Sequence, residues 1–239
     1  MSEWKQKRFW TNAEAVADGS GWTIELDGRR VKTPAKAALH LPTQSLAQAI
    51  AAEWAAQEDV VDPLSMPFTR SANAAIDKVA IQKAEVADML AAYGDADLLC
   101  YRADQPKELV DRQAAVWDAY LNWAAENLGA RLAPRTGLMH ESQDPAALTI
   151  LSETTHAMSP FALAAFHDLV SLSGSWVLGF AAAKDMTTLP EIWAASRLDE
   201  IWQAEQWGDD EEALELAKLR ETAFFHAKSF WNAAEGDVA

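Results

Sequence analysis

The stretch Arg197-Leu-Asp-Glu-Ile-Trp-Gln-Ala-Glu-Gln-Trp-Gly208 has the spacing of an amphipathic helix, the element that makes up most of this chain. At 100° per residue, Leu198 and Ile201 fall on one side, and Glu205 projects into the middle of that apolar side. We expect Gly208 to end the helix, because glycine accepts a left-handed backbone without strain.

Glu200 lies on the other side of the same predicted helix. Trp193 comes two turns before it and Trp207 two turns after it. A carboxylate beside tryptophan rings is costly to desolvate unless another group pairs with it. The stretch is therefore either a well-satisfied structural joint or a surface that meets a partner.

The composition excludes several classes of protein. The chain has 239 residues, half of them apolar, with 11 tryptophans and a formal net charge of −16. Such a chain can bury one large core or two small ones, and it is not disordered. The negative charge argues against nucleic acid and anionic membranes as partners, and it suits a soluble protein or one that meets a basic patch. A single cysteine, Cys100, excludes internal disulfides and fits a reducing compartment.

The first part of the chain predicts a small antiparallel sheet. Residues 22–26 alternate between apolar and polar, Asp27-Gly28 is a favoured hairpin turn, and residues 30–33 return. Thr43 then caps a helix whose apolar stripe ends at Trp54. Residues 62–67 contain two prolines and mark the predicted boundary between an N-terminal α+β domain, residues 1–67, and an all-helical domain, residues 68–239.

After Pro67 the apolar periodicity is helical almost throughout. Predicted helices cover 69–93, 106–128, 145–157, 160–184, a segment that begins at Thr188, and a last helix that ends near 231. The apolar run 161–183 is long enough to cross about 30 Å of hydrocarbon. It has no second span or basic flank, so we predict a buried central helix and no membrane insertion. The predicted fold class is α+β: a small N-terminal antiparallel sheet with a helix, followed by a larger helical bundle.

Motifs for catalysis or for cofactor binding are scarce in the sequence. The histidines lack a zinc spacing, and neither a Gly-rich phosphate loop nor a nucleophile elbow occurs, so we predict no cofactor and no metal. Asp95, Asp97 and Glu200 are the exception, since they could converge as metal ligands or as an acid–base pair. A carboxylate-dependent metal hydrolase therefore stays open as the alternative function, although the paired Glu-x-x-His motifs of carboxylate-bridged metal bundles are missing.

Three separated blocks carry a resemblance to a known family. They are Leu26-Asp-Gly-Arg-x-x-Lys-Thr-Pro34, Glu53-Trp-x-x-Gln57 with Met66-Pro67, and Glu200-x-x-Gln203-x-x-x-Trp-Gly208, with Asp95-x-Asp-x-x-x-Tyr-Arg102 between the last two. In order and spacing, from about residue 8 to 231, they resemble the assembly chaperones for the alpha subunit of the catalytic sector of ATP synthase, found in mitochondria and related bacteria. The resemblance implies a non-enzymatic chaperone that binds unassembled alpha subunit and prevents its aggregation.

The resemblance also implies which residues meet the client. The acidic functional residue of the family matches Glu200, with Gln203 and Trp207 beside it and Trp54 in the N-terminal helix. Glu205 is given no client role, and we expect it to pair internally and hold its helix in the bundle. An internal ion pair of Glu200, with Arg197 or with Arg102, is the structural alternative.

The resemblance and the chain together set expectations about partners and location. The client is the unassembled alpha subunit, the chaperone itself is predicted to be a monomer, and nucleic acid is not a partner. Residues 1–7 contain neither an apolar signal core nor an Arg/Ser-rich presequence, which favours a bacterial, cytoplasmic member. A processed mitochondrial member would lie in the matrix.

Overall fold

The structure, a computed structural model, describes residues 7–137, 140–208 and 210–236. These residues form two compact units. Unit 1 contains the described residues up to Lys83, together with 159–165 and the described residues from Ser229 on, and unit 2 contains 84–158 and 166–228. The helices α6 (Pro160–Ser173) and α10 (Glu211–Glu235) contribute several residues to each unit, and a third helix begins at Lys83, the last residue of the first segment of unit 1. A domain boundary after residue 67 stays a prediction.

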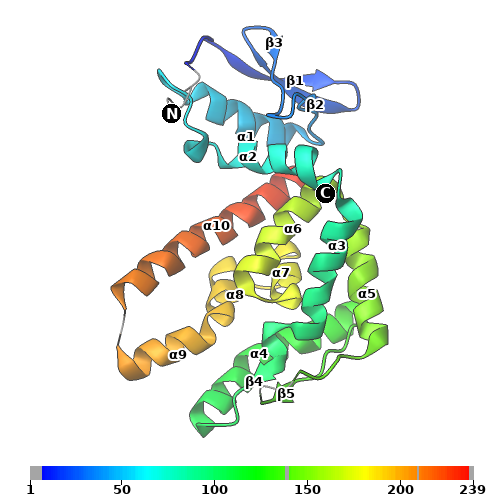
Figure 1. The fold of residues 1–239 in the computed structure, drawn as a ribbon, viewed down its shortest axis with the longest axis vertical. Helices are drawn as coiled ribbons and strands as arrows, with labels where there is room; N and C mark the ends of the chain where they lie inside the picture. Colours follow the sequence, from blue (N-terminus) through cyan, green and yellow to red (C-terminus); the bar gives the residue numbers. More distant parts are fainter. Residues whose placement is uncertain (1–6, 138–139, 209, 237–239) are drawn as a thin grey trace. The chain divides into compact units, whose positions relative to one another are not determined.

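Unit 1 contains the antiparallel sheet that the sequence predicts. Its strands are β1 (Ala13–Asp18), β2 (Gly21–Leu26) and β3 (Arg29–Arg30), in the order β1-β2-β3 (Figure 1). The turn between β2 and β3 places Asp27 at φ 47° and Gly28 at φ 78°, which a primed hairpin turn requires. Next to the hairpin, β1 begins at Ala13 and pairs with β2, while Ala38 and Leu41 make isolated bridges.

The first helical elements of unit 1 follow the sheet, and the first of them packs against it. They are α1 (Gln44–Ala55), a 3₁₀ turn η1 (Pro63–Ser65), α2 (Pro67–Ala74) and a π-helical turn η2 (Ala75–Val79). Thr43 caps α1, accepting a hydrogen bond from the Leu46 N–H at 3.1 Å, as predicted. Ile24 of β2 and Leu46 and Ile50 of α1 are fully buried, so the core of this unit lies between the sheet and α1.

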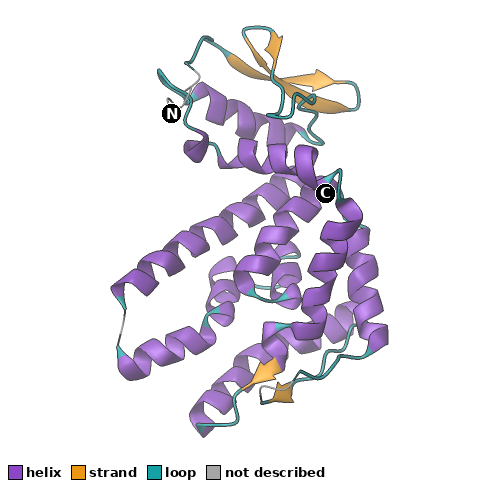
Figure 2. Ribbon diagram, viewed as in Figure 1, coloured by secondary structure: helices purple, strands orange, loops and turns teal. Residues whose placement is uncertain are grey.

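Unit 2 is helical apart from one short strand pair. Its elements are α3 (Lys83–Ala91), the 3₁₀ turns η3 (Ala92–Ala96) and η4 (Leu98–Cys100), β4 (Tyr101–Arg102), α4 (Lys107–Leu128), β5 (Arg135–Thr136), α5 (Pro145–His156), α7 (Trp176–Ala183), α8 (Leu189–Ser196), α9 (Leu198–Trp207) and most of α6 and α10 (Figure 2). The α+β fold class, with a small sheet first and a helical region after it, is therefore confirmed.

The predicted single helix over 160–184 is wrong. Gly174 adopts φ 71° between α6 and α7, and the Ser175 side chain caps α7 by accepting a hydrogen bond from the Leu178 N–H at 3.0 Å. A continuous apolar sequence hides this break, because its cause is a local backbone angle and not polarity. In the described part of the chain, no helix has the length and apolarity needed to cross a membrane.

The predicted helix over 69–93 is also interrupted. A π-helical turn and residues 80–82 separate α2 from α3. Asp77 lies in the π-helical turn, where its carboxylate accepts hydrogen bonds from the Thr33 hydroxyl at 2.6 Å and the Ala35 N–H at 3.0 Å. These bonds join residues more than forty positions apart in the sequence, which helical periodicity does not reveal.

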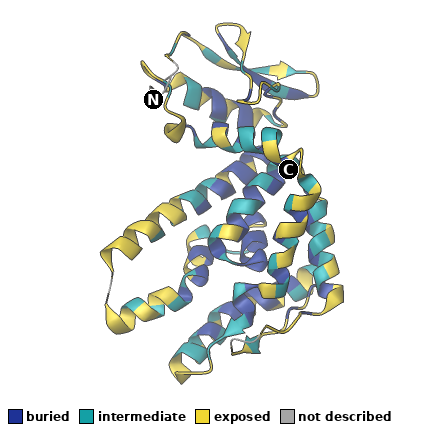
Figure 3. Ribbon diagram, in the orientation of Figure 1, coloured by how far each residue is buried: buried dark blue, intermediate teal, exposed yellow. Residues whose placement is uncertain are grey.

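Burial in unit 2 is uneven along the chain (Figure 3). Every residue of α7 is buried, and Trp117 and Trp176 are fully enclosed. By contrast, Leu198 alone is buried in α9, and residues 211–220 of α10 are exposed except for the half-buried Ala217. Part of unit 2 is thus a dense core, and its α9–α10 end is open to solvent.

Candidate functional site

The segment around Glu200 is two helices and not one. α8 begins after Thr188, as predicted, with a capping box in which Thr188 and Glu191 exchange hydrogen bonds, and it ends at Ser196. The backbone of Arg197 has φ −107° and ψ 12°, which lie outside the helical range. A separate helix, α9, therefore begins at Leu198. The picture of Glu200 midway between two tryptophans of one helix is therefore wrong.

Glu200 makes an ion pair with the residue at this break. The Arg197 Nη1 lies 2.7 Å from the Glu200 Oε1, and the side chain of Glu200 remains 49% exposed. The Arg197 guanidinium also lies over the Trp193 ring, 6.0 Å from its centroid. The internal pair with Arg197 is confirmed. The alternative pair with Arg102 is wrong, because Arg102 bonds to Asp118 at 2.8 Å.

The two tryptophans have different surroundings. Trp193 is buried, and its ring lies 5.5 Å from that of Phe224 on α10. Trp207, in the last turn of α9, is 80% exposed. Gln203, one turn after Glu200, is exposed as well. The structure therefore brings Glu200, Gln203 and Trp207 together on α9, with their side chains accessible to a partner.

Glu205 ties α9 to α4. The Arg112 guanidinium donates to both carboxylate oxygens of Glu205, at 2.5 Å and 3.0 Å, which lowers the pKa of the Glu205 carboxyl. Gln113 adds a second bond between these helices, donating to Asp199 at 2.7 Å. The internal role expected for Glu205 is confirmed, and it leaves Glu200 as the acidic residue of the first turns of α9 that faces away from α4.

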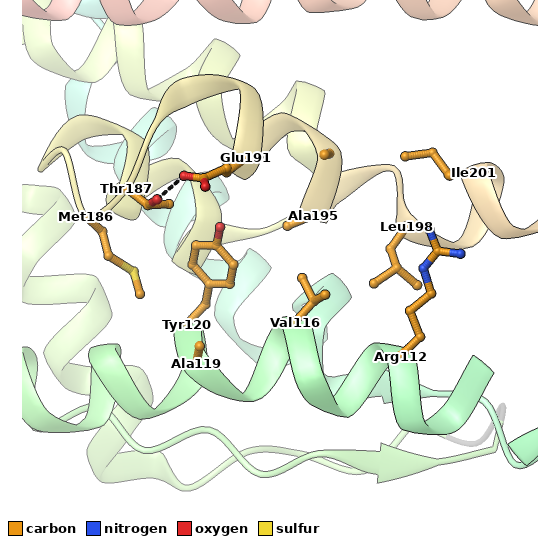
Figure 4. A pocket seen from close by; sticks show the side chains of 11 residues that line it. Arg112, Val116, Ala119, Tyr120, Met186, Thr187, Glu191, Ala195, Leu198 and Ile201 are labelled. Atoms are coloured by element: carbon orange, nitrogen blue, oxygen red, sulfur yellow. Dashed lines mark hydrogen bonds between the residues drawn. The ribbon is translucent and has the colours of Figure 1, made fainter. Parts of the chain in front are cut away.

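An apolar pocket of about 470 Å³ lies where α4, α8 and α9 meet (Figure 4). Most of its lining is aliphatic, from Val116, Ala119, Met186, Ala194, Ala195, Leu198 and Ile201. Figure 4 shows the Tyr120 side chain rising from α4 toward Glu191. Burial, and then the charge of Glu191, raise the pKa of the Tyr120 hydroxyl, so this residue is a neutral lining group and not a base.

A second hollow, of about 590 Å³, lies among α8, α9 and α10; we call it the α9–α10 groove. Its lining consists of Pro190, Trp193, Ala194, Arg197, Glu200, Ile201, Ala204, Glu205, Asp210, Ala213, Leu214, Ala217 and Glu221. Helical periodicity does not reveal this groove, because the groove depends on how α10 lies beside α9. Of the predicted client residues, Glu200 is part of its lining.

Trp54 lies in unit 1, in the last turn of α1, and is half-buried. Its ring meets the Trp10 ring edge-on at 5.2 Å, and its carbonyl accepts a hydrogen bond from the Trp10 indole at 3.2 Å. The Trp54 Nε1 is buried and has no hydrogen-bond partner among the described residues. Part of the Trp54 ring is therefore in internal contact and part of it is accessible. A client role for Trp54 stays a prediction.

The neighbours of Trp54 in the family motif are structural. The Glu53 carboxylate accepts hydrogen bonds from the N–H groups of Phe68 and Thr69, at 2.7 Å and 2.8 Å, and so caps α2. The buried Gln57 bonds to the Asp62 N–H at 2.7 Å and to the Ser65 hydroxyl at 3.0 Å. The motif thus fixes the loop between α1 and α2, a role that sequence reasoning missed.

The carboxylates of the alternative enzyme reading do not converge. Asp97 is fully buried and accepts hydrogen bonds from the N–H groups of Leu99 and Val177, at 3.0 Å and 3.1 Å. Burial raises the pKa of the Asp97 carboxyl to about 6. Asp95 bonds to the Gln143 N–H at 2.7 Å, and Glu200 pairs with Arg197. No group of three or more acidic, histidine or cysteine side chains that could hold a metal occurs in the described ranges.

Comparison with known proteins identifies the family. The model of the ATP12 chaperone protein family matches residues 7–125. The crystal structure of Atp12 from Paracoccus denitrificans is 46% identical, with a TM-score of 0.94, and the match covers 97% of this chain and all of that one. A mutant of P. denitrificans Atp12p matches equally, with 46% identity, a TM-score of 0.95, and coverage of 98% of this chain and all of the other.

A more distant relative is the mitochondrial protein atp12 of Schizosaccharomyces pombe, which is 26% identical over 88% of this chain and 76% of its own length. The agreement in sequence and in structure extends over nearly the whole chain, including α9 and α10. This protein belongs to the ATP12 chaperone family and is a chaperone of ATP synthase assembly.

Proposed function

We propose that the protein binds the unassembled alpha subunit of ATP synthase and prevents its aggregation until assembly. The observation that carries this proposal is the exposure of α9, where Trp207 is 80% exposed two turns after the half-exposed Glu200. A large aromatic side chain exposed to water two turns from a half-exposed carboxylate is typical of a binding surface and not of a core.

The physical basis is competition for an apolar interface. An unassembled subunit exposes the surface that its neighbour will cover, and such a surface aggregates. A chaperone covers it with an aromatic anchor inside a charged rim, and the true neighbour later displaces the chaperone. Trp207 is the anchor in this scheme, Gln203 adds a polar contact, and Glu200 pairs with an Arg or Lys of the client. Trp54 supplies a further aromatic contact from unit 1.

We also infer that the protein acts by binding and not by catalysis. The thiol of Cys100 is 1% exposed, and burial raises its pKa to about 12, so it is a poor nucleophile at neutral pH. The buried Asp97 carboxylate accepts hydrogen bonds from two backbone N–H groups and is not available as an acid or base for a substrate. We place the protein, as a monomer, in a bacterial cytoplasm, which the 46% identity to the Paracoccus structure supports more strongly than the 26% identity to the mitochondrial relative supports the matrix.

Co-expression with the alpha subunit alone tests the proposal. We expect soluble alpha subunit to depend on this protein, and the dependence to weaken for Trp207→Ala and for Glu200→Gln. Glu215→Gln, an exposed position on α10 outside the groove lining, is the matched control and should behave as wild type. Alpha subunit that stays soluble to the same extent with and without the chaperone would exclude the proposed function.

A further inference from the structure

The walls of the α9–α10 groove are two single helix faces. Lining residues recur mostly three or four positions apart on α9 and its cap, at 197, 200, 201, 204 and 205, and on α10 and its cap, at 210, 213, 214, 217 and 221. This spacing puts each set on one face of its helix. Alanines on all three helices leave the floor of the groove low, at positions 194, 204, 213 and 217. Side chains of another segment can therefore approach the helix backbones closely.

The α10 wall lacks the packing that usually stabilises a helix. Residues 211–220 are exposed except for the half-buried Ala217, and Leu214, which lines the groove, is 52% exposed. This exposed segment is the first part of the 25-residue α10, and the helix is anchored by buried residues further along, such as Phe224 and Phe230. An exposed leucine beside alanines in the lining of a groove favours a surface that another molecule covers.

The charge of the groove selects the partner. Its lining contains the carboxylates of Glu200, Glu205, Asp210 and Glu221 and a single guanidinium, that of Arg197. Arg197 pairs with Glu200 and Arg112 with Glu205, while the Asp210 carboxylate caps α10 by accepting from the Glu212 N–H at 3.0 Å. Glu221 is half-buried and has no ion-pair partner in the part of the chain that the structure describes. A cation at this position would gain a charge-assisted hydrogen bond.

We propose that the α9–α10 groove binds a short amphipathic helix of the client, whose small aliphatic face lies on the alanine floor and whose flanking lysine or arginine pairs with Glu221 and Glu200. This inference rests on the proposed function and names the recognition element on the client. It goes beyond the predicted client residues, because it adds Ala213, Ala217 and Glu221 of α10 to the binding surface.

The geometry of the walls favours a helix over an extended strand. Helical walls use their own backbone N–H and C=O groups internally, so they offer no ladder to an added strand. Recognition must therefore use side chains, as in helix-in-groove binding. The lining of α10 and its cap spans twelve residues, from 210 to 221, which corresponds to about 16 Å, or about three helical turns of a bound segment.

Thiol protection tests this assignment directly. Ala213→Cys places a thiol in the groove, and Leu219→Cys places one on α10 outside its lining. Native Cys100 is 1% exposed and does not compete for the label. With isolated alpha subunit at ten times its dissociation constant, we expect maleimide labelling of Ala213→Cys to slow about tenfold and labelling of Leu219→Cys to change much less.

A charge-matched pair gives an independent readout. Glu221→Gln should weaken binding of the alpha subunit by up to about fivefold and flatten its salt dependence, and Glu215→Gln should do neither. Thermal unfolding of both variants should match wild type, because the structure gives neither carboxylate an ion-pair partner among the described residues.

The possible failures are distinguishable. If alpha subunit binds, as shown by co-sedimentation, but leaves the Ala213→Cys thiol as reactive as before, the groove assignment is overturned and the proposed function stands. If alpha subunit does not bind at all, both fail. Protection of the groove thiol without client, growing with protein concentration, would assign the groove to a second copy of this chain and overturn the client helix.

Discussion

Trp117 of α4 donates its indole N–H to the carbonyl oxygen of Ala195, in the last turn of α8, at 2.8 Å and out of contact with solvent. Carbonyls in the last turn of a helix lack partners within the helix. This bond therefore satisfies a buried acceptor and fixes the point from which α9 departs. The direction of the proposed client surface depends on a core residue more than eighty positions before Glu200 in the sequence.

Trp117→Phe should destabilise the protein by about 1–3 kcal/mol beyond the loss of ring volume, because it leaves the Ala195 carbonyl buried without a donor. Denaturant unfolding measures the change. Trp123→Phe is the comparison, since Trp123 is half-buried on the same helix and contacts the Phe180 ring. Equal losses for the two variants would show that the hydrogen bond contributes nothing of its own.

Glu53→Gln should lower stability by about 1–3 kcal/mol, since a neutral amide replaces the carboxylate that accepts from the Phe68 and Thr69 N–H groups. Unfolding in urea is the measurement, with Glu58→Gln, at an exposed neighbouring position, as control. We expect the control to unfold as wild type does. A Glu53 variant that matches it would rule out the capping role.

Gly179→Ala should destabilise the α6–α7 contact by about 1–3 kcal/mol through overpacking. A Cβ at position 179 would lie 2.8 Å from the Val170 Cγ2 and 3.2 Å from the Val170 N. Adding Val170→Ala removes the first clash and leaves the second, so a double-mutant cycle should show partial rescue. Strictly additive losses would contradict the close approach.

Asp97 should make stability fall as pH rises. Its pKa is raised from 3.8 to about 6 in the folded protein, so between these values the folded state binds the extra proton. Stability from this group is present below about pH 4 and is lost as pH rises through 6, by about 3 kcal/mol in total. Unfolding free energies of wild type and Asp97→Asn between pH 4 and 7 should diverge by this amount. Parallel curves would mean that Asp97 does not titrate in this range.

Arg197→Ala should free Glu200 from its internal partner. If Glu200 pairs with a client cation, the variant should bind alpha subunit about two- to fivefold more tightly at low salt, with a steeper salt dependence. Surface-immobilised alpha subunit and a salt titration provide the measurement. Weaker binding would mean that the Arg197 guanidinium, and not Glu200, is the group that the client meets.

Local sequence signals predicted local structure well. The Asp27-Gly28 hairpin, the Thr43 cap and the helix start at Thr188 each depend on a few neighbouring residues, and all are confirmed. Helix breaks were missed where the cause is distant or purely backbone. The break at Gly174 lies in an apolar run, and the Val177 N–H beside it bonds to Asp97, 80 positions away.

The candidate site was predictable only in part. The motif around Glu200 could be found from the sequence, and the exposure of Trp207 agrees with the role expected for it. The break at Arg197 reverses the surroundings of Trp193, which pairs with Phe224 instead of flanking a surface carboxylate. The groove itself needs α10, whose alanines look like ordinary helix-forming residues until they face α9.

Gly208 adopts φ 92° and ψ 164° at the end of α9, a backbone region that is essentially restricted to glycine. The chain thus leaves α9 along a path set by a torsion angle, just before Asp210 starts the next helix. The direction of α9 and α10, the two walls of the groove, therefore depends on backbone geometry and not on which side chains line the groove. Substitutions among the lining residues can therefore change which client segment the groove binds while the arrangement of the two helices is retained. This separation would allow the chaperone and its subunit to coevolve.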